Sequence, residues 1–183
     1  ERLLQVPEYR NLYSRFLQFF RQRAFLLSNW SLRIDSLRQG ITNSAMLDTF
    51  RTKDYGFTTN DFFNSYSETG YSNQHVKFGL KQFINLRNQS LVSQLNFVSA
   101  PPIAYRIDYH PKSPLPNDTI FIKVSSFSNN TINEVAVHFI PFGSSVAQIY
   151  PLSFNPINNS TNVEDNDRWT GLIPPLGNIS GGS

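Results

Sequence analysis

Hydrophobic positions change their spacing near residue 98 of this 183-residue chain. Before it, apolar side chains recur at three- and four-residue steps, the spacing that places them on one face of a helix. After it, apolar and polar positions alternate, as expected of strands that are buried on one face. The sequence therefore predicts an α + β chain in two units, a helical unit over residues 1–98 and an antiparallel β unit over residues 99–183.

The first unit is predicted to hold three main helices and one short helical turn. Apolar faces run over 3–27 and 30–45, and Thr59 is a plausible cap for a turn that contains Phe62 and Phe63. The last helix is predicted within 75–97, where the apolar face comprises Val76, Leu80, Phe83, Ile84, Leu91, Val92 and Leu95. The prolines that follow at 101 and 102 cannot continue a helix. We interpret residues 1–98 as a helical bundle with an aromatic core.

The second unit contains five segments that alternate or are rich in β-forming residues: 103–109, 120–124, 135–139, 146–152 and 169–173. Turn residues separate them at short intervals, a pattern typical of an immunoglobulin-like antiparallel sandwich. Such a sandwich usually needs about seven strands. We therefore expect it to be incomplete, with an open edge that another copy, or the remaining part of a parent protein, would cover.

Charge is distributed unevenly, with 12 Lys and Arg against 7 Asp and Glu over 1–98, and 4 against 6 over 99–183. The arginines lie between apolar helical positions, so a solvated helix face explains them better than nucleic-acid binding. No apolar run approaches the roughly 20 residues of a membrane span. Because neither an initiator Met nor a signal peptide opens the chain, we expect a mature or excised part of a longer protein.

Asparagine is frequent, and seven of the 19 asparagines begin an Asn-x-Ser/Thr acceptor sequence for N-glycosylation. These glycosylation candidates are Asn29, Asn88, Asn117, Asn129, Asn158, Asn159 and Asn178. Composition alone would produce about three such sequences by chance. The excess favours an extracellular or cell-surface protein that contacts other extracellular proteins.

The residues suggest no catalytic, cofactor-binding or metal-binding site. There is no cysteine, and the three histidines have no metal-ligand spacing. His138 is expected to point outward from its strand. The run from Glu164 to Asp167 has oxygen ligands but lacks the pattern of a calcium loop, so we interpret it as solvated charge. A glycan-stacking role for Tyr105, Tyr109 or Trp169 is a weaker alternative, because such aromatic residues usually lie in a core.

Three stretches of the helical half carry a family resemblance. The first is Glu8-Tyr9-Arg10 with Tyr13, and the second comprises the positions Ile34, Ile41, Asp48 and Arg51. The third is Gly79-Leu80-Lys81-Gln82-Phe83-Ile84-Asn85-Leu86-Arg87 with Gln94-Leu95. Over roughly residues 3–97 the chain resembles the C-terminal part of CotH-type spore-coat kinase domains. Secreted members of that family often continue into immunoglobulin-like modules, which the second half is similar to.

The resemblance implies a parent that is an atypical, secreted protein-serine kinase using ATP and a divalent metal. The family's nucleotide, metal and catalytic residues precede the matched part, so no catalytic residue is carried over and this chain alone is expected to be inactive, without a cofactor. Gly79, Lys81 and Arg87 are family-pattern positions for which we expect structural roles. The alternative is a non-enzymatic extracellular structural or adhesive subunit.

Overall fold

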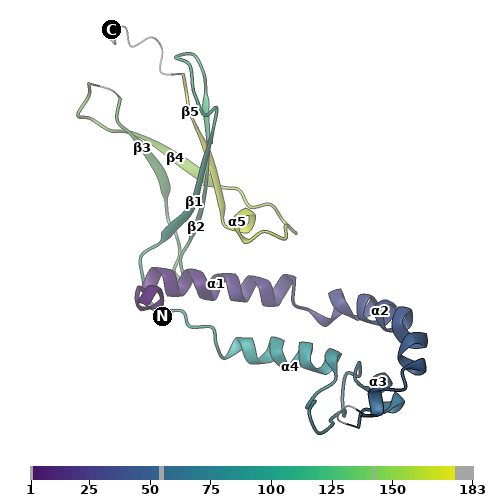
Figure 1. Ribbon diagram of the computed structural model, residues 1–183. Coiled ribbons are helices and arrows are strands. Elements are labelled where there is room, and N and C mark those ends of the chain that lie inside the picture. Colours follow the sequence, from purple (N-terminus) through teal and green to yellow (C-terminus); the bar gives the residue numbers. More distant parts are fainter. Residues whose placement is uncertain (1, 54–55, 142, 176–183) are drawn as a thin grey trace. The chain divides into compact units, whose positions relative to one another are not determined.

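The computed structural model describes residues 2–53, 56–141 and 143–175 (Figure 1). Within these ranges the chain is α + β, with five α-helices, two 3₁₀ turns and one five-stranded antiparallel sheet. The predicted fold class is confirmed at this level. Asn178 lies outside the described residues.

The helices lie close to the predicted positions, with different ends. They are η1 (Arg2–Gln5), α1 (Pro7–Arg23), α2 (Leu27–Leu47), η2 (Arg51–Lys53), α3 (Thr59–Asn64) and α4 (Leu80–Val92). Pro7 is the first residue of α1, a position that tolerates its missing N–H, and it separates the short turn η1 from the main helix, as its place in the sequence predicts. Helix α4 is shorter than the predicted 75–97 because it begins after extended Gly79 and ends at Ser93.

Each predicted strand is present. The strands are β1 (Ile103–His110), β2 (Ile120–Phe127), β3 (Val135–Phe139), β4 (Gln148–Phe154) and β5 (Arg168–Ile173), and their order in the sheet is β1-β2-β5-β4-β3. A short helix, α5 (Val163–Asn166), lies in the segment between β4 and β5. His138 is exposed, as predicted.

These strands form one curled sheet rather than two sheets packed face to face, so the immunoglobulin-like sandwich is not confirmed. In Figure 1 the β3–β4 ribbon diverges from the β1–β2–β5 strands. Gly171 permits close approach of β5 and β4, because a Cβ at this position would overlap the Leu152 side chain. The apolar core of the sheet consists of Ile122, Val124, Leu152 and Ile173.

The chain divides into two compact units whose boundaries differ from the expected one at residue 98. Residues up to Phe16 group with those from Asn96 onward, and residues 17–95 form the second unit. Two buried polar side chains explain this division. Asn11 exchanges two 2.8 Å hydrogen bonds with the Val98 backbone, and Ser14 pairs with the Asn96 backbone at 3.1 Å. The first half of α1 therefore belongs with the sheet.

The unit over residues 17–95 has a small core, in which the buried hydrophobic residues are Phe19, Ile34, Tyr71, Ile84 and Leu91. Helix α2 contacts both α3 and α4. Many other apolar side chains of these helices are exposed, among them Leu32 at 83% and Leu47 at 80%. The regular helical bundle expected from the sequence is therefore not confirmed.

Candidate functional site

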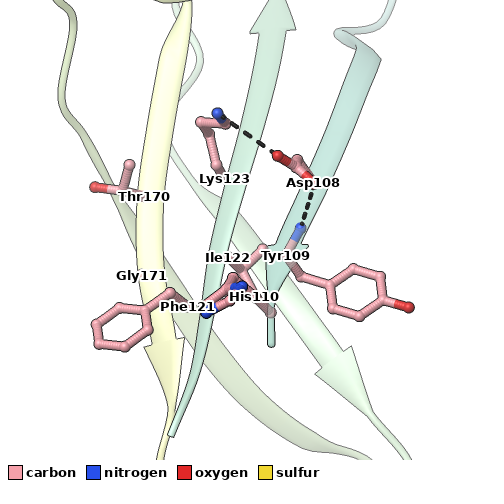
Figure 2. A pocket seen from close by; sticks show the side chains of 8 residues that line it. All are labelled: Asp108, Tyr109, His110, Phe121, Ile122, Lys123, Thr170 and Gly171. Carbon is pink, nitrogen blue, oxygen red and sulfur yellow. Dashed lines mark hydrogen bonds and ion pairs between the residues drawn. The ribbon is translucent and has the colours of Figure 1, made fainter. Parts of the chain in front are cut away.

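A shallow hollow lies along β1, β2 and β5 (Figure 2). Its volume is about 250 Å³, and its lining residues are Asp108, Tyr109, His110, Phe121, Ile122, Lys123, Thr170 and Gly171. Strand register explains the grouping, since Asp108 faces Lys123, and Lys123 faces Thr170 on the next strand. No local sequence pattern indicates this site, because its residues come from three separate segments.

Electrostatics at this hollow centre on Asp108. Its carboxylate accepts a 2.6 Å hydrogen bond from the Lys112 ammonium and lies 3.6 Å from the Lys123 ammonium. The Lys112 hydrogen bond is the main reason that the pKa of Asp108 lies below its ordinary value. The carboxylate also accepts a 3.0 Å hydrogen bond from the Tyr109 backbone N–H, shown in Figure 2. A fixed carboxylate between two ammonium groups, beside exposed Phe121, suits contact with a polar partner.

The outer edge of β1 adjoins this hollow. Among the described residues β2 is the only strand that pairs with β1, so the opposite side of β1 is an open edge. Ile107 and Tyr109 are 67% and 45% exposed, although their cross-strand partners Val124 and Ile122 are buried in the sheet core. Tyr109 is therefore not the core residue that the sequence analysis expected. Strand β3 is the other edge of the sheet.

A buried polar network joins α1 to the sheet in the same unit. The Arg15 guanidinium donates to both carboxylate oxygens of Asp167, with a shortest distance of 2.6 Å, and the Tyr105 hydroxyl donates to Asp167 at 3.1 Å. Burial, followed by the nearby carboxylate, raises the pKa of Tyr105 far above its ordinary value. Phe16 packs edge-on against Tyr105, and the Arg15 guanidinium lies over the Phe127 ring.

This network corrects one expectation and shows a limit of sequence reasoning. The run from Glu164 to Asp167 was interpreted as solvated charge, which is wrong for Asp167, because its side chain is only 8% exposed. Glu164 does form a surface ion pair, with Arg106 at 3.3 Å. Arg15 and Asp167 are 152 positions apart, and no local pattern links them. Trp169 is half-buried and packs against Phe154, in keeping with the expected core position.

The sequence-predicted glycosylation candidates fall into two structural groups. Four of them are exposed in turns or loops of the sheet unit: Asn117, Asn129, Asn158 and Asn159. Asn88 and Asn29 instead lie in helices, where their side-chain amides bond to the backbone at the end of α1. The Asn88 amide donates to the carbonyls of Arg21 and Phe25, at 2.9 and 2.5 Å, and that of Asn29 donates to Arg23 at 2.7 Å.

Two family-pattern positions of α4 make specific contacts within the helical unit. A Cβ on Gly79 would lie 2.5 Å from the Ser67 carbonyl oxygen, so only glycine fits there without movement of the backbone. Lys81 forms a 2.8 Å ion pair with Asp35 of α2, and this hydrogen bond lowers the pKa of Asp35. Arg87 is exposed.

Within the described ranges, no group of three or more His, Cys, Asp or Glu side chains could hold a metal ion. No helix of that part of the chain is both long enough and apolar enough to cross a membrane. Comparisons with family models, with curated proteins and with solved structures found no match to this chain.

Proposed function

We propose that this chain is a non-catalytic assembly module of an extracellular or cell-surface protein. The observation that carries the proposal is the curled sheet with two open edges, β1 and β3, within the described residues. An exposed edge presents unpaired backbone N–H and C=O groups and pairs readily with a strand of another chain. The immunoglobulin-like sandwich expected from the sequence would then be completed by strands from outside these residues.

Side chains at the β1 edge favour such an addition. Ile107 and Tyr109 share a face with the buried Val124 and Ile122, because directly opposed residues in antiparallel strands point to the same side of the sheet. A strand added at β1 would bury these two exposed side chains and extend the apolar core sideways. Each fully buried side chain of this size contributes about 1.5–3 kcal/mol.

Sedimentation of the full chain over a range of concentrations tests the module. We expect concentration-dependent association that a double variant, Ile107→Lys with His138→Lys, reduces by placing a charge at an exposed position of each edge strand. The control is Leu115→Lys, which changes an exposed apolar residue outside the strands and should leave association unchanged. A chain that stays monomeric up to its solubility limit would count against the proposal.

We propose further that the module is exported and glycosylated on the sheet unit. Asn117, Asn129 and the adjacent pair Asn158 and Asn159 are exposed, as a glycan acceptor must be. Asn88 uses both Nδ2 hydrogens in backbone hydrogen bonds, and a glycan would replace one of them. Expression in a glycosylating secretory system, followed by site mapping with mass spectrometry, should find glycans on the exposed sites and none on Asn88. Full occupancy of Asn88 in folded protein would contradict this assignment.

We also propose that the helical unit is the end of a CotH-like C-lobe whose catalytic part belongs to the parent. The contacts of Gly79 and Lys81 support this proposal, since both family-pattern residues have a packing or pairing role in this fold. On this basis the parent would transfer phosphate from ATP, with a divalent metal, to serines of surface proteins. Incubation of the full-length parent with ATP, metal and casein tests the activity, and absence of phosphotransfer would refute it.

A further inference from the structure

The charges of the β1 edge are arranged symmetrically about one residue. Arg106 and Asp108 flank Ile107 and point to the outer face of the sheet, where their cross-strand neighbours on β2 are Ser125 and Lys123. In the single chain Arg106 forms an ion pair with Glu164 at 3.3 Å, and Asp108 forms one with Lys112 at 2.6 Å; both are exposed surface pairs that a second copy can replace. A strand with opposite charges at equal distances from a central residue is complementary to its own antiparallel copy. In such a pair, each arginine lies opposite the aspartate of the other strand.

We propose that a second copy of this chain pairs antiparallel with β1 about a twofold axis at Ile107, joining two five-stranded sheets into one. This inference rests on the proposed function as an assembly module and names its partner. Arg106 of each copy lies opposite Asp108 of the other, and the two Ile107 side chains meet on the face that carries the core. A twofold contact of this kind is self-complementary and closed, so it yields a dimer.

Neighbouring registers are less favourable. A twofold axis through any residue of the strand gives opposed residues that differ by an even number of positions and so share a face. An axis at Arg106 or at Asp108 places two like charges directly opposite each other, which is destabilising. An axis at Tyr109 places Ile107 opposite Pro111, which has no N–H to donate. The register centred on Ile107 gives each charge an opposite partner and places Pro111 opposite Ile103, beyond the last strand residue His110.

Backbone geometry also fits this register. The Tyr109 N–H donates to the Asp108 carboxylate at 3.0 Å, an arrangement that fits an amide directed away from β2. Because the direction alternates along a strand, the Ile107 N–H and C=O then point toward the open edge as well. Two Ile107 residues at the axis can exchange a reciprocal pair of hydrogen bonds. Asp108 would release the Tyr109 amide when it turns to Arg106 of the second copy.

Charge exchange between the strands provides the test, using the full chain and sedimentation equilibrium. The Arg106→Asp variant has acidic residues at both 106 and 108, so two like-charge acidic pairs form across the dimer contact. The Asp108→Arg variant has basic residues at both positions, so two like-charge basic pairs form there. Each single variant should associate about tenfold more weakly than the unchanged chain, because both opposite-charge pairs become like-charge pairs. The double variant, and an equimolar mixture of the two single variants, should regain dimerisation. Recovery in the mixture shows that both single variants are folded.

A charge on the other edge separates this inference from the broader proposal. His138→Lys, at the exposed position of β3, should leave the dimer unchanged if the contact is made by β1. If His138→Lys abolishes association while the charge variants of β1 still associate, the β1 pairing is overturned and the assembly function stands. Failure of the mixture to recover, with each variant folded by circular dichroism, would also overturn it. A chain that is monomeric at every concentration would overturn both.

Discussion

Replacing Asp167 with Asn tests the network that joins the first half of α1 to the sheet. The change removes the negative charge from a carboxylate that binds Arg15 through both of its oxygens and accepts a hydrogen bond from the Tyr105 hydroxyl. The side chains of Arg15 and Asp167 are only 18% and 8% exposed, so water cannot fully replace the lost partner. The Arg15 charge would then remain nearly buried without an opposite charge.

The expected destabilisation follows from this geometry. Breaking a fully buried ion pair by removing one partner costs about 3–5 kcal/mol. Asparagine retains an oxygen that can accept one of the hydrogen bonds, and Arg15 keeps slight access to solvent. We therefore expect the sheet unit to lose about 2–3 kcal/mol of unfolding free energy, since one hydrogen bond to a charged group is worth about 1.5–3 kcal/mol.

Urea unfolding measures this loss. The chain has two tryptophans, and a Trp30→Phe background leaves Trp169 of β5 as the reporter for the sheet unit. With a typical slope of about 1–3 kcal/mol/M, the midpoint should fall by about 0.7–3 M. The control is Glu164→Gln, which removes the surface pair with Arg106, whose side chains are 36% and 59% exposed, and should cost less than about 0.5 kcal/mol. Equal midpoints for the two variants would refute the reasoning.

Two further predictions concern the helical unit. Gly79→Ala should lower the unfolding free energy of the helical unit by at least about 1–3 kcal/mol, because the new Cβ would meet the Ser67 backbone. Gly40→Ala, in the middle of α2 with open space around it, should raise this free energy by about 0.5–1 kcal/mol. Comparable thermal shifts in both would contradict this packing. Hydrogen bonds from Thr58 hold the pKa of Asp61 at about 2, so its contribution to stability should be present above about pH 4 and lost as the pH falls toward 2. Carboxyl titration by NMR should show this pKa rising toward 4 in Thr58→Val, and an unchanged value would argue against the cap.

Local sequence patterns predict the helices and strands of this chain well, but they predict poorly which side chains of these elements are buried. The five strands follow from alternation, and α3 follows from a capping threonine, although Thr58 rather than Thr59 is the cap. Exposure was harder to predict. The apolar periodicity of α4 is real, yet only Ile84 and Leu91 of that helix are buried. Periodicity records which side chains share a face, and only the packed neighbours decide how much of that face is covered.

Candidate sites show the same division. The sequence by itself determined the acceptor asparagines and the change of period near residue 98, because each is a property of neighbouring residues. Only the tertiary structure decided that β1 is an edge, that Asn88 binds the end of α1, and that Asp167 is buried against Arg15. These outcomes depend on contacts between residues far apart in the chain, which local spacing does not encode.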